Sequence, residues 1–224
     1  MTWLDDATVD LAVFDLRPDY RALLIVAEGL RGGPSDAESE ALLVRAESAG
    51  VSIEHPHLEA WRDAFRQFGA NPRKTRPSAD ALVRRASSAA SGGGLPRIDR
   101  ITDTYNALSV LHAIPTGGED LAGYVGPLRL ARADGTEPFD TIADGVELVD
   151  HPLPGEVVWR DDAGVTCRNW NWRQCIRTRL SPATTRAVFI FDALAPITDD
   201  ELEQIGDDLL AALKPESSER RLLR

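Results

Sequence analysis

The sequence is poor in cysteine and in long apolar segments, and each scarcity excludes a class of protein. Cys167 and Cys175 are the only cysteines, too few for a disulfide-stabilised framework, so we expect reduced thiols and a cytoplasmic protein. No apolar run approaches the roughly 20 residues of a membrane span. Residues 1–6 lack the basic and apolar regions of a signal peptide. The sequence thus predicts neither secretion nor a membrane partner.

The sequence also lacks the short motifs of common cofactor and metal sites. It contains no P-loop, no dinucleotide-binding glycine pattern, no HExxH and no GxSxG motif. Cys167 and Cys175 are spaced unlike zinc-knuckle ligands, and Cys167 has no base close to it in sequence. His55 and His57 flank a proline without further ligand-type neighbours. We therefore expect no cofactor, no metal and two buried, inert thiols.

What is present is a globular composition with an acidic balance. Hydrophobic residues make up 43% and charged residues 27% of the 224 residues, which is enough for a domain with a proper core. The formal net charge is −11. By itself, this charge argues against a polyanionic partner.

The positive charge, however, is concentrated in two segments. Residues 61–100 contain nine basic and three acidic side chains, and residues 168–191 contain five arginines and no acid. If the two segments meet in the fold, they form a basic face that can neutralise the phosphates of a nucleic acid. The alternative is a set of solvated helix faces with scattered ion pairs, and the sequence leaves both open.

Periodicity and capping signals predict an α+β fold, because strands and helices do not alternate regularly. Strands are expected at residues 11–16, 20–27, 127–133, 155–160, 164–169 and 187–192. Helices are expected at residues 36–49, capped by Ser35, and at 58–68, 78–89, 101–112 and 199–213. We expect a single domain over residues 1–214 and a frayed polar tail over 215–224.

The densest cluster of unusual residues is the segment 167–179, in which asparagine and tryptophan alternate. If this segment is extended, its tryptophans share one face and its asparagines the other. Aromatic rings beside arginine and amide groups suit stacking on a base, such as the adenosine at a tRNA end. The alternative is a pair of core tryptophans with polar residues at the sheet edge.

The stretch 97–120 combines a polar helix face with a loop that contains glycine. Asp103 and Asn106 are three residues apart and therefore share one helical face. Residues 115–118 predict a loop whose exposed N–H groups can serve an oxyanion or a ribose hydroxyl. The alternative is a helix cap followed by a tight turn.

These motifs resemble the B3/B4 domain, the tRNA-editing domain of the bacterial phenylalanyl-tRNA synthetase β chain, in its free-standing form. The pattern of that domain is an R-P-I-N-N-x-x-D-x-T-N-Y run followed by a G-Q-P-L-H-A-F-D run. It is matched here by Arg97, Ile98, Asp103, Asn106, Pro115 and Asp120. Residues 61–82 and 155–174 are similar to free-standing members, so the resemblance covers roughly residues 55–195.

The resemblance implies a β-sandwich-like core flanked by helices and hydrolysis of the ester that joins a wrong amino acid to tRNA. Free-standing relatives are thought to act in trans, one branch on tRNA charged with the arginine analogue canavanine. Gly117 stands where the synthetase pattern has a pocket histidine, and the tryptophan–asparagine run replaces a glycine-rich pocket segment. The amino-acid pocket must therefore differ from that of the synthetase.

An aminoacyl ester is already activated, so the site needs a held water and oriented donors rather than a protein nucleophile. We expect Asn106 and the amides of Gly117 and Gly118 to orient the ester, with Asp120 or Glu156 as base or side-chain anchor. The residues expected to bind the tRNA end are Arg73, Lys74, Arg76, Arg97, Arg168, Asn169, Trp170, Asn171, Trp172, Arg173 and Gln174. The alternatives are a tRNA- or RNA-binding module without catalysis and a small-molecule binding protein on the same fold.

Overall fold

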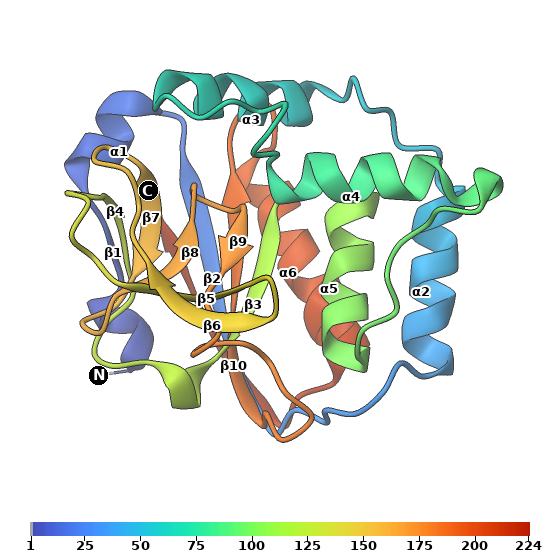
Figure 1. Cartoon of the computed structure of the whole chain (residues 1–224). Coiled ribbons are helices and arrows are strands. Elements are labelled where there is room, and N and C mark those ends of the chain that lie inside the picture. The colour runs from blue at the N-terminus through green and yellow to red at the C-terminus, as the bar shows by residue number, and fades with distance from the viewer. Residues whose placement is uncertain (1) are drawn as a thin grey trace.

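Two β-sheets form the centre of the computed structural model, which describes residues 2–224 (Figure 1). The five-stranded sheet has the order β1 (Thr8–Val9), β4 (Arg129–Arg132), β7 (Val157–Arg160), β8 (Val165–Arg168) and β9 (Arg173–Gln174). The four-stranded sheet has the order β11 (Ser217–Leu223), β2 (Arg21–Glu28), β10 (Arg186–Ala193) and β3 (Thr116–Asp120). The α+β class and the sandwich-like core flanked by helices are confirmed.

Strands β2 and β10 pair antiparallel along their whole length at the centre of the four-stranded sheet. Both strands read as continuous apolar runs, because both of their faces are covered. Along β2, Leu24 and Val26 belong to the core between the sheets, while Leu23 and Ile25 belong to the core under the helices. The four-stranded sheet therefore separates two hydrophobic layers.

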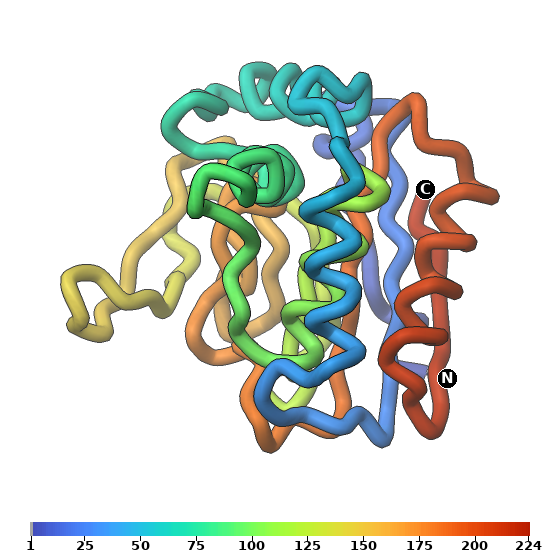
Figure 2. The backbone as a smooth tube through the Cα atoms, turned by 90° about the vertical axis from the view of Figure 1, so that its right-hand side faces the viewer, coloured from blue at the N-terminus to red at the C-terminus, as the bar shows by residue number. Residues whose placement is uncertain are grey.

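The helices cover the outer face of the four-stranded sheet and its upper end (Figures 1 and 2). Helix α5 (Arg100–Leu111) contacts α2 (Ala37–Ser48), α4 (Ser78–Ser87), α6 (Asp199–Leu213) and strand β3. Residues 101–110 are all buried as a result. Helix α3 (Pro56–Gln67) lies across the top of Figure 1, where Trp61 and Phe65 enter the core between the sheets.

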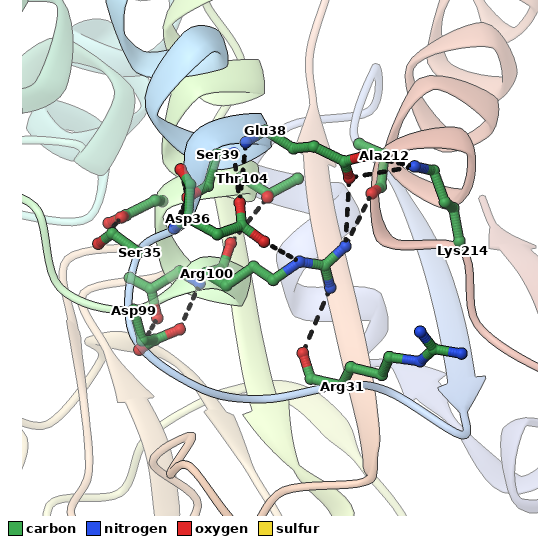
Figure 3. Close-up of polar contacts among 12 residues, drawn as sticks. Arg31, Ser35, Asp36, Glu38, Ser39, Asp99, Arg100, Thr104, Ala212 and Lys214 are labelled. Atoms are coloured by element: carbon green, nitrogen blue, oxygen red, sulfur yellow. Dashed lines mark hydrogen bonds and ion pairs between the residues drawn. The ribbon is translucent and has the colours of Figure 1, made fainter.

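The guanidinium of Arg100, at the first residue of α5, ties together three helix ends (Figure 3). Its Nε donates to Asp36 Oδ2 at 2.8 Å, and its Nη2 donates to the carbonyl of Ala212 at 3.4 Å. Lys214 donates to Glu38 at 2.8 Å in the same cluster. These contacts fix the start of α2 and the end of α6 against α5, and α5 carries Asn106 towards the interior.

The remaining elements are peripheral. Strands β5 (Phe139–Ala143) and β6 (Val146–Asp150) form a separate hairpin that projects from the body of the molecule (Figure 2). The short helices are η1 (Trp3–Asp6), α1 (Leu11–Leu16), η2 (Ala89–Ser91) and η3 (Leu121–Gly123).

The strands expected at 20–27, 155–160, 164–169 and 187–192 and the five expected helices are confirmed within a few residues. The strand expected at 11–16 is wrong, because this segment forms helix α1. The position beside β4 is taken instead by Thr8–Val9, which pairs parallel to it. The cap of α2 is Asp36 rather than Ser35, since the Asp36 carboxylate accepts from the amides of Glu38 and Ser39.

The expectation of a frayed polar tail is also wrong. Residues 217–223 form strand β11, which pairs antiparallel with β2 over seven register positions. Without β11, the N–H and C=O groups on one edge of β2 would have no strand partner. The backbone of the tail supplies these bonds while its polar side chains remain at the surface.

Candidate functional site

A pocket of about 160 Å³ lies where the two sheets meet helices α4 and α5. On one side of the pocket lie strands β7, β8 and β9 and the turn between β8 and β9, and on the other side lie strands β3 and β10. The lining residues are Ser78, Tyr105, Asn106, Thr116, Gly117, Glu119, Trp159, Cys167, Trp170, Asn171, Trp172, Gln174, Ile190 and Asp192. Six of the predicted site residues meet here, although they come from three separate parts of the chain: Asn106, Gly117, Trp170, Asn171, Trp172 and Gln174.

The tryptophan–asparagine run is a tight turn between β8 and β9, so the expectation of an extended segment is wrong. Asn169 and Trp170 have φ angles of 47° and 67°, and the amide of Trp172 donates to the carbonyl of Arg168 at 3.0 Å. Trp170 is fully buried, with its ring centroid 5.0 Å from that of Tyr20. Trp172 is only partly buried. Trp170 is therefore a core residue, as the alternative interpretation of the sequence expected, whereas the ring of Trp172 remains partly accessible.

The two asparagines of the turn have different partners. The backbone N–H of Asn169 donates to Glu156 at 2.9 Å, which holds the turn against the chain before β7. The side-chain oxygen of Asn171 accepts from the amide of Ser78, the first residue of α4, at 3.4 Å. This bond joins the turn to the basic segment before α4.

The expected loop at residues 115–118 is instead largely strand β3, which pairs with β10 at the edge of the sheet. Along an edge strand, the backbone groups of successive residues point alternately toward the neighbouring strand and away from it. The carbonyl of Pro115 accepts from Asp192 N and therefore points toward β10, whereas Asp120 N donates to Thr178 O on the opposite side. The amide of Gly117 therefore faces β10, and that of Gly118 faces the other side. Of the two predicted donors, only Gly118 N–H points away from β10, on the side where its own carbonyl accepts from Gln174 at 3.1 Å.

Asn106 projects from α5 into the pocket and is 8% exposed. Asp103, on the same helical face, is fully buried but accepts from the amide of Ile98 at 2.8 Å and from the hydroxyl of Ser35. Asp103 therefore anchors the segment before α5, while Asn106 lines the site.

Besides the basic residues Arg73, Lys74, Arg76 and Arg173, six predicted residues lie outside the lining of the pocket. Asp120 caps η3 by accepting from the amide of Ala122 at 2.9 Å. Glu156 accepts from both Nε and Nη2 of Arg168, at 2.9 and 2.7 Å, inside the protein. Arg97 pairs with Glu40 and Glu47 on α2. The other three are Arg168, Asn169 and Gly118.

Sequence reasoning missed two carboxyl groups that line the pocket. Asp192 is 3% exposed and accepts from the hydroxyl of Tyr20 at 2.5 Å. Glu119 is fully buried and accepts at one oxygen from Tyr124 at 2.6 Å and from Thr178 at 2.8 Å, while Oε1 has no partner. Within residues 2–224, neither carboxyl lies in an ion pair with lysine or arginine. The only sequence signal is an acid at the end of the apolar run 187–191 and another after a glycine pair.

Burial is the main cause of the altered acidity of these groups. It raises the pKa of Asp192 to about 7, against a donor bond from Tyr20 that lowers it. Burial also raises the pKa of Glu119, while its bonds from Tyr124 and Thr178 lower it. The pocket thus contains two carboxyls whose charge depends on the ligand and on pH.

Several hydrogen-bonding atoms in the wall of the pocket are buried without a protein partner. They are Trp159 Nε1, Trp170 Nε1, Asn171 Nδ2, Ser78 Oγ and Glu119 Oε1. A buried polar atom without a partner costs about 1–3 kcal/mol. So many such atoms around one small space favour a polar ligand or ordered water there.

Four basic side chains next to the pocket residues in sequence have no carboxylate within ion-pair distance among residues 2–224. Arg73 and Lys74 are exposed and Arg76 half-buried in the segment before Ser78. Arg173 is exposed, and its guanidinium carbon lies 4.9 Å from the centre of the Trp172 ring. The two basic segments therefore meet here, through the bond between Ser78 and Asn171.

The other basic residues of these segments are largely ion-paired, as the alternative interpretation of the charge expects. Arg62, Arg84, Arg97, Arg100, Arg168, Arg177 and Arg186 all have carboxylate partners. The basic surface available to a polyanion is thus smaller than the charge count of the segments suggests.

None of the helices within residues 2–224 has the length and hydrophobicity that a transmembrane span requires. In the same range, no three His, Cys, Asp or Glu side chains are grouped as possible metal ligands. Cys167 and Cys175 are both free and buried, and burial raises the pKa of each thiol, to about 11 for Cys175.

Comparison with known proteins gives the class of the chain. The model of the B3/4 domain family matches residues 60–204, and the chain belongs to this family. A solved structure that is similar to it is an N-terminal fragment of the phenylalanyl-tRNA synthetase β-subunit from Pyrococcus horikoshii, with a TM-score of 0.47 and 12% identity. The alignment covers 97% of this chain and 50% of that fragment, so the chain spans half its length. No curated protein sequence matches the chain.

Proposed function

We propose that this chain is a trans-editing deacylase that hydrolyses the ester of mischarged aminoacyl-tRNA. The proposal rests on one observation: Asn106 meets the Trp170–Trp172 turn at a small half-open pocket, next to four basic side chains that have no acidic partner within residues 2–224. A small pocket with orphaned polar atoms suits an aminoacyl group, and the basic side chains suit the phosphates that carry it.

The tRNA end is proposed to lie over the Ser78–Asn171 junction. Arg73, Lys74 and Arg76 would contact phosphates, and the partly exposed ring of Trp172, with Arg173 above it, offers a surface on which the terminal adenine can stack. This proposal removes Arg97 and Arg168 from the expected phosphate contacts, because their charges are neutralised within the chain.

The ester is proposed to lie beside Asn106, whose amide can donate to the carbonyl oxygen as negative charge develops on it. The Gly118 N–H is the second proposed donor, because the strand pairing occupies the amide of Gly117. Gly117 instead forms part of the wall of the pocket.

The rejected amino acid is proposed to be an arginine analogue such as canavanine, as in one branch of the free-standing relatives. The buried carboxyl of Glu119 supports this choice, since its Oε1 is unpartnered and no lysine or arginine within residues 2–224 pairs with it. Because the substrate is tRNA, the proposed compartment is the cytoplasm.

The test is a deacylation screen over tRNAs charged with correct and incorrect amino acids. We expect hydrolysis of a subset of mischarged tRNAs, lost in Asn106→Ala with retained tRNA affinity. Asp162→Asn is a control outside the pocket, since Asp162 pairs with Arg129 at the surface. Absence of hydrolysis above background for every charged tRNA would reject the enzyme.

A tRNA-binding module without catalysis is the second candidate, favoured by the glycine that replaces the pocket histidine of the synthetase pattern. It predicts salt-sensitive tRNA binding without turnover. Absence of tRNA binding even at low salt would instead favour a small-molecule binding protein.

A further inference from the structure

We infer that Asp192 accepts the proton of the water that attacks the ester, and that Tyr20 is its positioning residue. The inference deepens the proposed function and rests on it, because it assigns the base of the same reaction. It differs from the sequence expectation, which assigned this role to Asp120 or Glu156.

The first support is the position of the carboxyl. Asp192 comes from β10 and lines the pocket, which at about 160 Å³ is small enough to bring it near any acyl group bound against Asn106. Its Oδ1 accepts from the Tyr20 hydroxyl at 2.5 Å. Tyr20 is in turn packed edge-on against Trp170 and Trp61, at 5.0 and 6.4 Å between ring centres. The Asp192 side chain is therefore held at the pocket by a rigid partner, and no rearrangement is needed to place it there.

The second support is the set of donors around the carboxyl. The indole N–H of Trp159 and the side-chain N–H of Asn171 line the same pocket, and within residues 2–224 neither makes a hydrogen bond of ordinary geometry, although both lie near enough to Asp192 to lower its pKa. A buried water typically makes about three hydrogen bonds. A water that accepts from one of these donors and donates to Asp192 keeps a lone pair for attack on the ester carbon. The wall of the pocket thus has the groups that hold a nucleophilic water beside a base.

The third support is that no lysine or arginine within residues 2–224 is paired with the Asp192 carboxyl. Glu156, the alternative from the sequence, is occupied by Arg168 and by two backbone amides. Asp120 caps η3 and accepts from Thr184. A carboxylate that is already paired with a guanidinium or saturated by donors is a weak proton acceptor. Asp192 accepts a hydrogen bond from the neutral hydroxyl of Tyr20, and its further polar contacts are with the neutral N–H groups of Trp159 and Asn171.

The charged and titratable groups around Asp192 set its basicity. They are Tyr20, the residue before β2, and Glu119 from β3, and the charge of Asp192 in turn raises the pKa of the Cys167 thiol on β8. The pKa of Asp192 is raised to about 7, mainly by burial and in smaller part by the negative charge of Glu119, while the contacts of Tyr20, Trp159 and Asn171 act in the opposite direction. A general base whose pKa lies near the working pH is the most effective one.

The proposed step balances without a co-reactant. The water oxygen bonds to the ester carbon as one of its protons passes to the Asp192 carboxylate, and the carbonyl oxygen becomes an oxyanion. When this intermediate collapses, the bond between the carbon and the ribose oxygen breaks. The ribose oxygen takes the proton back from Asp192. The products are the amino acid and a tRNA with a free terminal hydroxyl.

The test compares wild type with Asp192→Asn, which keeps the shape of the side chain, in single-turnover deacylation across pH 5–9. General-base catalysis typically contributes about 10²- to 10⁴-fold, so we expect a rate loss of that order in D192N. The dissociation constant for uncharged tRNA should be unchanged. Wild type should show a rate that rises with pH around neutrality, and D192N should lose this rise.

Tyr20→Phe separates a positioning role from a structural one. Loss of the donor bond should raise the pKa of Asp192 and move the rise in rate to higher pH. A uniform loss of rate at every pH would mean that Tyr20 only supports the packing, and would overturn its assignment.

Glu119→Gln tests the neighbouring carboxyl by the same measurement of deacylation rate against pH. If E119Q, and not D192N, removes the rise, Glu119 is the base and the inference is wrong.

The outcomes distinguish this inference from the proposed function. If wild type hydrolyses mischarged tRNA and a folded D192N keeps both the rate and its pH dependence, the inference is overturned while the deacylase stands. If wild type hydrolyses no charged tRNA, the deacylase itself falls. Thermal unfolding of each variant shows whether a loss of rate reflects a loss of the fold.

Discussion

At the scale of single residues, buried polar groups in this protein serve either the packing or the pocket, and their partners show which. His57 belongs to the packing. Its Nδ1 lies 2.8 Å from the carbonyl of Ala113, and its Nε2 accepts from Trp61 and from the amide of Leu194. An imidazole with this pattern is neutral, with its proton on Nδ1. It links α3, the end of α5 and the chain after β10.

His57 should therefore make the stability of the protein depend on pH. Burial lowers its pKa from 6.5 to about 4. In the unfolded chain the imidazole binds a proton as pH falls below 6.5, whereas the folded state resists protonation until about pH 4. Stability contributed by this group is thus lost as pH falls through that window.

Urea unfolding of wild type and His57→Gln at pH 7 and pH 5 tests this expectation. The variant should be less stable at pH 7 by about 1–3 kcal/mol, because partners of His57 lose a buried bond. The difference between the two proteins should shrink at pH 5. His151→Gln is the control, since His151 is exposed. An unchanged difference at the two pH values would contradict a neutral buried His57.

The sequence predicted some residues of the pocket and missed others for a physical reason. Asn106 and Trp172 could be selected because a polar helix face and a run of tryptophans beside arginine and amide groups are visible in the sequence. Glu156 and Asp192 could not be told apart, since both follow or precede apolar strand residues. Their roles differ because of their partners in the folded chain: Glu156 is paired with the guanidinium of Arg168, whereas Asp192 accepts from the hydroxyl of Tyr20.

At the scale of elements, strand β3 shows how two adjacent glycines serve different purposes. A Cβ at Gly118 would lie 3.0 Å from ring carbons of both Phe189 and Tyr105. A Cβ at Gly117 would lie 2.9 Å from Nε2 of Gln174, the end of a flexible side chain. Gly118 allows α5 to approach the sheet, whereas Gly117 keeps space in the pocket.

The alanine variants of these two glycines should therefore differ in kind. Gly118→Ala should lose about 1–3 kcal/mol of stability, because two packed rings must move. Gly117→Ala should unfold close to wild type but lose deacylation, because the new methyl group displaces Gln174 into the pocket. Thermal unfolding and a deacylation assay on both variants check this. Equal stability losses would contradict the assignment.

The element predictions failed where backbone pairing, rather than side-chain pattern, decides the structure. The tail 215–224 has no apolar periodicity, yet β11 forms because β2 has an open edge beside it. The amphipathic helices α3 and α4 were predictable, because their apolar positions repeat at helical spacing and face the core. Strands β2 and β11 are about 190 residues apart in the chain, so no local sequence pattern indicates that they pair.

Removal of residues 215–224 should therefore destabilise the whole domain. The edge of β2 would lose its strand partner, and Leu223, which is 6% exposed, would leave the core between the sheets. We expect a lower urea midpoint and increased light scattering, because exposed edges pair between molecules. A shorter truncation that removes only Arg224 is the control. A tail that can be removed without either effect would show that β11 contributes little.

At the scale of the whole molecule, the net charge of −11 does not decide which partners the protein takes. Ion pairs neutralise most arginines of the two basic segments within the chain. Arg73, Lys74 and Arg173 have no acidic partner in the part of the chain that the structure describes, and they lie on the side of the pocket. An acidic protein with one such basic region should bind tRNA in a single orientation and with a steep dependence on salt.

The salt dependence of tRNA affinity therefore tests the whole arrangement. Each phosphate contact contributes about 0.7–0.9 to the slope of log affinity against log salt. Replacement of Arg73, Lys74 and Arg173 by glutamine should lower affinity at low salt and reduce the slope by about 2–3 if each contacts one phosphate. Arg97→Gln is the matched control, because Arg97 is held by Glu40 and Glu47 and should leave the slope unchanged. A slope that falls in R97Q and not in the triple variant would place the tRNA on the α2 side of the molecule, away from the pocket.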